Sequence, residues 1–235
     1  MCANYQPPTR ADLEDYFGVT LSLSTDPAEA YPGSLSPIVR RAGDATDISA
    51  RRRADLATFG LVPHWADSTL ARRTYNARSE TVASKPSFRD AYRHGRFCVI
   101  PAQMLYEPSY ESGNAVRFAI ANTDGSPLGI AGIWEHRPGT DGETLLSFSM
   151  LTINADEHPL MRRFHKQGDE KRMVVVLPPD RIDVWLDSGY QDAPAFFVPY
   201  PAESLTMQAA PKADREGGKV PADTPEAAQQ GFPWM

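Results

Sequence analysis

Cys2, which follows the initiator Met1, has the most distinctive chemistry in this chain. Methionine aminopeptidase normally removes methionine when the next side chain is small, as cysteine is. Removal would leave an α-amine with a pKa of about 7.7–8 beside a thiol with a pKa of about 8.5. Such a 1,2-aminothiol captures an aldehyde first as an imine and then, through thiol attack, as a five-membered thiazolidine ring. The position therefore points to carbonyl capture; the alternative is a cysteine at position 2 without a chemical role.

Three polar side chains further along the chain have the chemistry to support such a nucleophile. Glu107 follows a stretch expected to be a buried strand, where desolvation would raise its pKa; otherwise it caps the turn before Pro108. His165 carries an imidazole that can shuttle protons near neutral pH, unless it is simply solvated in a polar loop. The Asn76 amide both donates and accepts, as positioning an amine requires, although asparagine is also common in turns.

The charges of the chain are distributed unevenly. A formal net charge of −6 over 235 residues argues against a protein that coats nucleic acid non-specifically. The segment 51–96, however, holds ten basic residues, nine of them arginine, against four acidic ones. Arginine suits planar, bidentate phosphate contacts, so this segment predicts a local anion-binding face that includes Arg72 and Arg73. A solvated, salt-bridged surface is the alternative.

Two further residues of this segment have a suggestive position. Arg78 lies two residues after Asn76, so both side chains point to the same side if the segment is extended. Trp65 can form an aromatic wall on which a base stacks, a contact worth ~1–3 kcal/mol in proteins that bind single strands. A core position is the alternative for Trp65, and the two interpretations are equally supported.

These residues need a scaffold, and the chain is rich in short strand patterns separated by turn signals. Strands are expected at 97–100, 116–120, 129–134, 146–152 and 173–177. Short helices are expected at 11–17, 86–94 and 181–186. We predict an α+β fold: a single β-rich domain with a mainly antiparallel sheet or barrel-like core and peripheral helices. The domain is expected to span 1–201, followed by a poorly ordered tail over 202–235.

Composition excludes several classes of protein. With 41% hydrophobic residues, the chain can bury one large core or two modest ones, and a single compact domain is favoured. It has no apolar run of roughly 18 residues and no signal-peptide pattern, so we expect a soluble cytoplasmic protein, with a monomer favoured. Cys2 and Cys98 cannot build a disulfide framework and have no partner at metal-ligand spacing, so neither a metal nor a cofactor is expected. Cys98, in an apolar strand pattern, is expected to pack.

Five stretches of the chain occur in a recognisable order: 1–2, 60–65, 76–81, 94–107, and His165 followed by 172–177. The N-A-R-x-E-T pattern and the order Cys, Asn, Glu, His are the most specific features. In these features, and over nearly its whole length, the chain resembles the SRAP family, the SOS response-associated peptidases.

The resemblance implies covalent crosslinking to abasic sites in single-stranded DNA, which shields the lesion. Cys2 is then the crosslinking residue, Asn76 orients the amine and the sugar, Glu107 and His165 manage protons, and Arg78 holds a phosphate. An abasic sugar is mostly a closed hemiacetal, so an acid or base must open its ring before the amine attacks. The expected partner is single-stranded DNA, which would bring the protein to the nucleoid. The expected DNA contacts are Arg78, Trp65, Arg72 and Arg73.

The sequence departs from the family pattern in three places. Asn4 stands where the family commonly has an arginine that contacts phosphate. Around the acidic residue, 105–108 reads Leu-Tyr-Glu-Pro and lacks the usual aromatic neighbours. Residues 166–171 separate the assigned histidine from the Arg-Met pair that normally follows it closely. We assign His165 rather than His158, because the insertion can be accommodated after His165.

Two other functions fit the same residues. One is an N-terminal-nucleophile cysteine peptidase or amidohydrolase, in which Cys2 attacks acyl carbonyls with help from His165 and Asn76; removal of Met1 by the protein itself would be a minimal version. A lyase side reaction is also compatible with the crosslinking chemistry. The other function is non-covalent binding of single-stranded or modified DNA, for which Cys2 would be dispensable.

Overall fold

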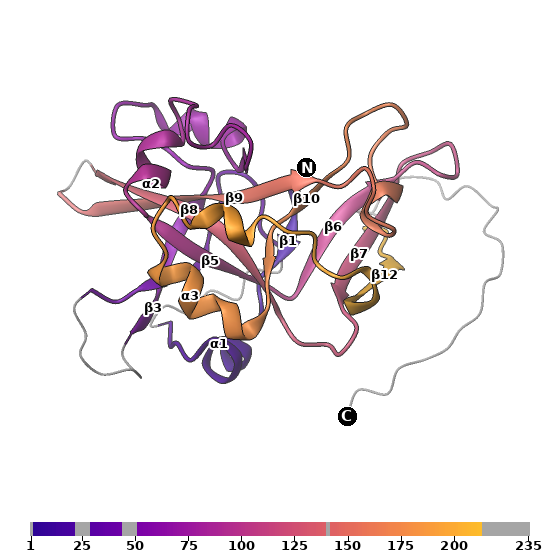
Figure 1. Ribbon diagram of the computed structural model, residues 1–235, viewed down its shortest axis with the longest axis horizontal. Coiled ribbons are helices and arrows are strands. Elements are labelled where there is room, and N and C mark those ends of the chain that lie inside the picture. Colours follow the sequence, from indigo (N-terminus) through magenta and orange to yellow (C-terminus); the bar gives the residue numbers. More distant parts are fainter. Residues whose placement is uncertain (1, 22–28, 44–50, 140–141, 213–235) are drawn as a thin grey trace.

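The computed structural model describes residues 2–21, 29–43, 51–139 and 142–212. Two β-sheets lie side by side, with short helices around them (Figure 1). The larger sheet carries α2 and α3 and occupies the left of the view, and the smaller sheet lies on the right. The expected β-rich α+β fold with peripheral helices is confirmed.

Five strands of the larger sheet close into a barrel-like ring. The ring order is β9, β3, β2, β5 and β8, and it closes because β8 also pairs with β9. The β3–β9 pair is parallel, whereas the other four pairs in the ring are antiparallel. The bounds are β2 (Leu35–Arg41), β3 (Arg52–Phe59), β5 (Phe97–Ala102), β8 (Leu128–Pro138) and β9 (Thr144–Asn154).

Three short strands attach to this ring. The three are β4 (Asn76–Arg78), β10 (Arg172–Val174) and β11 (Val176–Leu177). The strand predicted at 173–177 is therefore divided between β10, which pairs with β9, and β11, which pairs with β8. At the crossing point Val175 bonds both neighbours, because its N donates to Leu151 O and its O accepts from Ala131 N. The other four predicted strands lie within β5, β7, β8 and β9.

The smaller sheet is antiparallel and contains the strand that follows Cys2. Its order is β1 (Tyr5–Gln6), β6 (Met104–Ser109), β7 (Val116–Asn122) and β12 (Leu205–Ala209). Because β12 pairs with β7 over five residues, the expectation of a poorly ordered tail from 202 is wrong for 202–209. The part of that tail from 213 onward lies outside the described residues.

The helices are short and their ends have local causes. The predicted helix at 11–17 is α1 (Arg10–Phe17), which starts at a capping box between Thr9 and Asp12 and ends at the left-handed Gly18. The helix predicted at 86–94 is only α2 (Arg89–Arg93), preceded by turns. The helix predicted at 181–186 is α3 (Ile182–Asp187), entered through η4 (Pro179–Arg181). In the described ranges, no helix has the length and apolarity to cross a membrane.

Among the described residues, four further 3₁₀ turns connect these elements. They are η2 (Ser68–Arg73), η3 (Met161–Arg163), η5 (Ala193–Phe196) and η6 (Ala202–Ser204). Of these, η2 leads from the end of β3 to β4, so it shapes the approach to Asn76. The turn η3 stands just before His165.

An aromatic core supports the N-terminal strand. Phe59 stacks on Phe148 with ring centroids 5.2 Å apart, and Tyr5 and Phe59 form a T-shaped pair with ring centroids 5.4 Å apart. The Tyr5 hydroxyl donates to Ser36 Oγ at 2.6 Å, which satisfies its buried polar group. Tyr5 thus anchors β1 in the barrel three residues after Cys2. Cys98 is fully buried in β5 and packs, as expected.

Candidate functional site

Cys2 is buried beside the start of β1, with 2% of its surface exposed. Its Sγ donates to Asn4 O at 3.5 Å, and the same carbonyl accepts from Tyr106 N at 2.9 Å. Its own carbonyl accepts a hydrogen bond from Asn76 Nδ2 at 2.7 Å. The N-terminal segment is therefore held between β6 on one side and β4 on the other, with the thiol in a desolvated position.

Asn76 reaches Cys2 because β4 pairs in parallel with β9, opposite Met150. The Asn76 side chain is mostly buried, and its Oδ1 has no hydrogen-bond partner among the described residues. A buried acceptor without a partner is costly, so it marks a position where a donor from an amine or a hydroxyl group would be stabilised. The amide thus fixes the Cys2 backbone with its nitrogen and presents an open acceptor with its oxygen.

Glu107 lies within β6, with 3% of its surface exposed. Burial raises the pKa of its carboxyl group to about 7, although a hydrogen bond with the Cys2 side chain opposes the shift. The expected effect of desolvation is thus present. Burial also raises the pKa of the Cys2 thiol, and the negative charge of Glu107 raises it further. Near neutral pH the thiol is protonated, and the carboxyl group is divided between its acid and base forms.

His165 contacts Glu107 from the other side. The Nε2 atom lies 3.3 Å from Glu107 Oε2, and the His165 main-chain N donates to Pro108 O at 2.8 Å. Its backbone is left-handed, with φ of 65°, a conformation that costs about 1–3 kcal/mol in a residue with a side chain. Desolvation is the main cause that lowers the pKa of His165, to about 4. The imidazole is therefore neutral at pH 7, and its Nε2 faces the carboxyl group without a second charge.

A pH-dependent stability follows from the buried carboxyl group. Between pH 4.5 and about 7, folded Glu107 keeps a proton that the unfolded chain has lost, so its contribution to the free energy of unfolding falls as pH rises. As pH rises from 4.5 to 8, the free energy of unfolding of Glu107→Gln should increase by about 3 kcal/mol relative to that of the original chain. Urea unfolding across this range measures the difference.

Glu111→Gln is the matched control for that measurement. Glu111 lies in the turn after β6, and its Oε2 is 2.9 Å from Arg163 Nη2, which contributes to a lowered carboxyl pKa. The sign is therefore opposite: the carboxylate of Glu111 stabilises the fold once it ionises, and its glutamine variant should lose stability relative to the original chain as pH rises. A pH-independent difference for Glu107→Gln would contradict the raised pKa.

Arg78 shares β4 with Asn76, as expected for an extended segment, but its guanidinium group is already engaged. Nη1 lies 2.7 Å from Glu170 Oε2, and the second Glu170 oxygen, Oε1, accepts from Arg172 Nη1 at 2.7 Å. Arg172 is buried and also bonds Glu80. Nearly half of the Arg78 side chain remains exposed. A phosphate at Arg78 would therefore share or replace the contact with Glu170.

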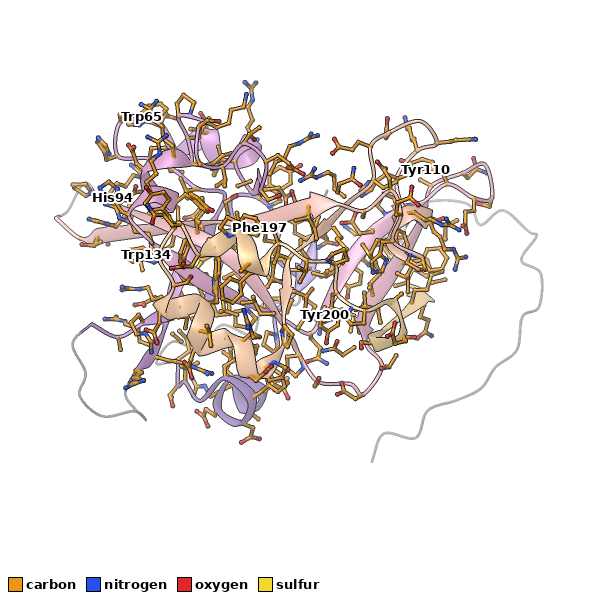
Figure 2. All side chains as sticks on the ribbon, viewed as in Figure 1. Trp65, His94, Tyr110, Trp134, Phe197 and Tyr200 are labelled. Carbon is orange, nitrogen blue, oxygen red and sulfur yellow. The ribbon has the colours of Figure 1, made fainter. Side chains whose placement is uncertain are left out.

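Trp65 is 56% exposed, and this exposure excludes the alternative that it is a core residue. It lines a surface hollow of about 600 Å³ together with Arg72 and Arg73, which end η2 and are both exposed. In Figure 2 Trp65 lies at the upper left, whereas Tyr110 in the turn between β6 and β7 lies at the upper right. The structure thus brings Cys2, Asn76, Glu107 and His165 together, and none of these four residues lines the hollow at Trp65.

His158, which was not assigned a role, has a structural one. Its Nδ1 accepts from the main-chain N atoms of Leu160 and Met161, and Nε2 bonds Tyr200 O at 2.8 Å. The ring therefore caps the start of η3 and fastens it to the C-terminal segment. Within the described ranges, no cluster of three or more His, Cys, Asp or Glu residues could hold a metal ion.

Sequence reasoning missed several residues around the site. Tyr75 is half-buried next to Asn76, and burial together with the charges of Cys2 and Glu107 raises its pKa. Asn4, which stands in place of the family's common arginine, accepts at Oδ1 from Arg117 Nη2 at 2.8 Å. The Arg117 guanidinium also lies over the Tyr106 ring, with the central carbon 3.4 Å from the ring centroid. The sequence identified Asn4 only as a departure from the family pattern, and of the residues it missed only Tyr75 had a signal, its position directly before the N-A-R pattern.

With this geometry in place, comparison with known proteins is decisive for the family. The family described as SOS response associated peptidase (SRAP) matches residues 1–213. The chain belongs to the SRAP family. A solved structure of a protein from Bordetella bronchiseptica is 36% identical, with a TM-score of 0.80 over 89% of this SRAP chain and 100% of that chain. A second, from Bacteroides thetaiotaomicron, is 20% identical with a TM-score of 0.75 over 90% of this chain and 93% of that chain, and supports the fold.

Curated relatives of this SRAP chain carry more specific names. The abasic site processing proteins YoqW and YobE of Bacillus subtilis are 29% and 30% identical over 152 residues, which is 63% of this chain. The abasic site processing protein HMCES of Xenopus tropicalis is 27% identical over 184 residues, or 67% of this chain. The matches span 64% and 66% of the two Bacillus proteins and 52% of the Xenopus protein.

Proposed function

We propose that this SRAP protein processes abasic sites in single-stranded DNA by forming a thiazolidine crosslink through Cys2 after Met1 has been removed. The observation that carries the proposal is the convergence of four side chains: Asn76 binds the Cys2 carbonyl, and Glu107 contacts both the Cys2 thiol and His165. The names of the curated relatives support the same substrate.

The first chemical step is opening of the abasic sugar. Glu107, whose pKa is about 7, is protonated in a substantial fraction of molecules at neutral pH and donates its proton to the ring oxygen. The neutral imidazole of His165 takes the proton of the C1 hydroxyl group, and the C1–ring oxygen bond breaks. The products are a C1 aldehyde and a free C4 hydroxyl group, and no atom is lost.

The second step joins the aldehyde to Cys2. The neutral α-amine attacks C1, and the resulting carbinolamine loses one water molecule to give an imine. The thiol sulfur then adds to the imine carbon, and its proton ends on the nitrogen, which closes the thiazolidine ring. Glu107 is placed to relay that proton, and the Asn76 Oδ1 acceptor suits an N–H donor from the amine. Overall, one water leaves for each crosslink formed.

The hydrolase alternative has less support from the site. A cysteine peptidase uses a thiolate, which a neighbouring imidazolium or other positive group stabilises. Here burial and Glu107 raise the pKa of the Cys2 thiol, and desolvation keeps His165 neutral. Amine-first capture needs no thiolate in the resting protein, so the electrostatics favour carbonyl capture over acyl hydrolysis.

The test uses Met1-processed protein, single-stranded DNA with one abasic site, and a denaturing gel with intact mass analysis. We expect an adduct without any reductant, with the combined mass minus one water. Cys2→Ala retains an N-terminal amine but no thiol, so it should give an adduct only when borohydride reduces the imine. Absence of any adduct with the processed, unmodified protein would refute the proposal. Steady release of peptide or amide products would instead support the hydrolase.

A separate prediction concerns the DNA path. We propose that Trp65, Arg72 and Arg73 extend the strand-binding surface away from Cys2. In a Cys2→Ala background, Arg72→Ala combined with Arg73→Ala should weaken reversible binding of single-stranded DNA about tenfold at low salt. The slope of log affinity against log salt should fall by about 0.7 for each phosphate that the protein no longer neutralises. Fluorescence anisotropy at several salt concentrations measures both quantities.

Arg10→Ala serves as the control for that prediction. Arg10 is exposed on α1, which lies at the lower edge of the molecule, away from Trp65 (Figures 1 and 2). Its removal deletes one positive charge without touching the hollow, so affinity and salt slope should stay near those of the parent. Equal losses in both variants would indicate a general charge effect and would contradict a localised path at Trp65.

A further inference from the structure

The ammonium group of Lys171 donates hydrogen bonds to two backbone carbonyl groups at the start of the loop that follows His165. Its Nζ donates to His165 O at 3.1 Å and to Lys166 O at 2.7 Å. Its main-chain N donates to Asp156 Oδ1 at 2.8 Å, and its main-chain O accepts from Ala155 N at 2.7 Å. Lys171 therefore connects the loop to Ala155 and Asp156, which directly follow β9 of the barrel-like ring.

His165 needs such restraints because its backbone is the only one outside glycine with a positive φ among the described residues. An unfavourable backbone conformation of this kind persists when the surroundings over-determine it, and it often marks a functional position. The contacts that hold His165 include its N on Pro108 O, its imidazole on Glu107, and its carbonyl on Lys171. Of these, the contact with Lys171 comes from a residue that is not otherwise part of the site.

We propose that Lys171 is a positioning residue, whose ammonium group holds the His165 carbonyl so that the backbone stays left-handed and the imidazole stays on Glu107. This inference deepens the proposed function and rests on it, because it concerns proton transfer at the same site. The loop 166–171 is the segment that separates His165 from the Arg-Met pair, so the restraint is a feature of that inserted loop.

The charge of Lys171 acts in the same direction as its geometry. Desolvation and then the positive charge of the N-terminal amino group are the larger causes of the lowered pKa of His165; the positive charge of Lys171 adds to them, whereas Asp169 opposes the shift. The charged or titratable groups that act on the imidazole are thus Glu107, the N-terminal amino group, Lys171 and Asp169. A neutral imidazole accepts the proton that ring opening requires, so the ammonium group supports both the position and the protonation state.

The experiment compares Lys171→Met, which removes the charge but keeps most of the stem, with Lys171→Arg, which keeps the charge. Lys166→Met is the matched control: it removes the same charge from the same loop, and Lys166 Nζ lies toward the Tyr110 ring, 5.8 Å from its centroid. The first readout is the NMR titration of the His165 ring protons, assigned by their loss in His165→Gln. The second is the rate of adduct formation with abasic single-stranded DNA.

We expect the pKa of His165 to rise toward its usual value of about 6.5 in Lys171→Met, and to stay low in Lys171→Arg and Lys166→Met. The adduct should form about tenfold more slowly in Lys171→Met and recover most of its rate in Lys171→Arg. An unchanged His165 titration in Lys171→Met overturns the inference, whatever the rate. If the unmodified protein forms no adduct, the proposed function fails, while the titration still decides the role of Lys171.

Discussion

Glu107→Gln lowers the rate of adduct formation about 100-fold or more while reversible binding of single-stranded DNA stays unchanged. The expectation rests on the burial of the carboxyl group between the Cys2 thiol and His165 Nε2, where glutamine can occupy the space but cannot transfer a proton. General acid–base catalysis by a positioned side chain contributes ~10²–10⁴-fold. Quenched time points on a denaturing gel give the rate, and anisotropy in a Cys2→Ala background gives the affinity.

The pH dependence provides a second signature of the same group. Ring opening needs protonated Glu107, so that step slows as pH rises through about 7, whereas the attacking amine must be neutral, which favours higher pH. The unmodified protein should therefore show a bell-shaped rate profile, and Glu107→Gln should retain only the rising limb. Glu111→Gln, at an exposed carboxylate in the next turn, should keep both the rate and the bell. A full rate in Glu107→Gln would remove Glu107 from the mechanism.

The stability and rate predictions for Glu107 belong together. A carboxyl group held near pKa 7 by burial destabilises the folded state once it ionises, yet the same shift gives it a useful proton at neutral pH. A glutamine at this position should therefore give a more stable and less reactive protein. That combination separates a catalytic carboxyl group from a structural one, whose loss would reduce stability.

The sequence predicted local elements better than their pairing. Strands with several consecutive apolar or β-branched residues, such as those in β5 and β9, were recognised because each can be identified from its own residues. The strand β12 was missed because its sequence, Leu-Thr-Met-Gln-Ala, carries a weak pattern, and its order comes from pairing with β7 more than 80 residues earlier. Long-range pairing of this kind leaves little trace in a single sequence.

The candidate site shows the same difference between what local sequence predicts and what long-range contacts determine. The sequence indicated chemical roles for four residues, Cys2, Asn76, Glu107 and His165. The resemblance to a family indicated that these four residues belong to one site. Three features could not be predicted, because each depends on how two distant segments meet: the Asn76 Oδ1 that has no partner among the described residues, the left-handed backbone of His165, and the contact of Arg78 with Glu170. Spacing along the chain therefore identified the chemistry, and the fold determines which atoms face one another.

Gly60 lies at the start of the loop that leads from β3 to Asn76 in β4. We expect Gly60→Ala to lower the free energy of unfolding by about 4 kcal/mol. Gly60 has φ of 118°, and a Cβ there would lie 2.0 Å from the main-chain O of Ala71. Ala71 is buried within η2, so its backbone cannot easily move. One residue on, Leu61 N donates to Thr74 O at 3.2 Å, which closes the loop just before β4. Relieving the clash would therefore disturb the approach to Asn76.

The control for this prediction is Gly33→Ala. Gly33 also has a positive φ, of 96°, but a Cβ there meets no atom within 4 Å, so only the backbone penalty of about 1–3 kcal/mol applies. Urea unfolding with a common slope compares the two variants, and the excess loss in Gly60→Ala measures the steric conflict with Ala71. Failure of Gly60→Ala to accumulate as folded protein would agree with this account. Equal losses in the two variants would contradict it, since they would mean that the loop between β3 and β4 can shift to admit a methyl group.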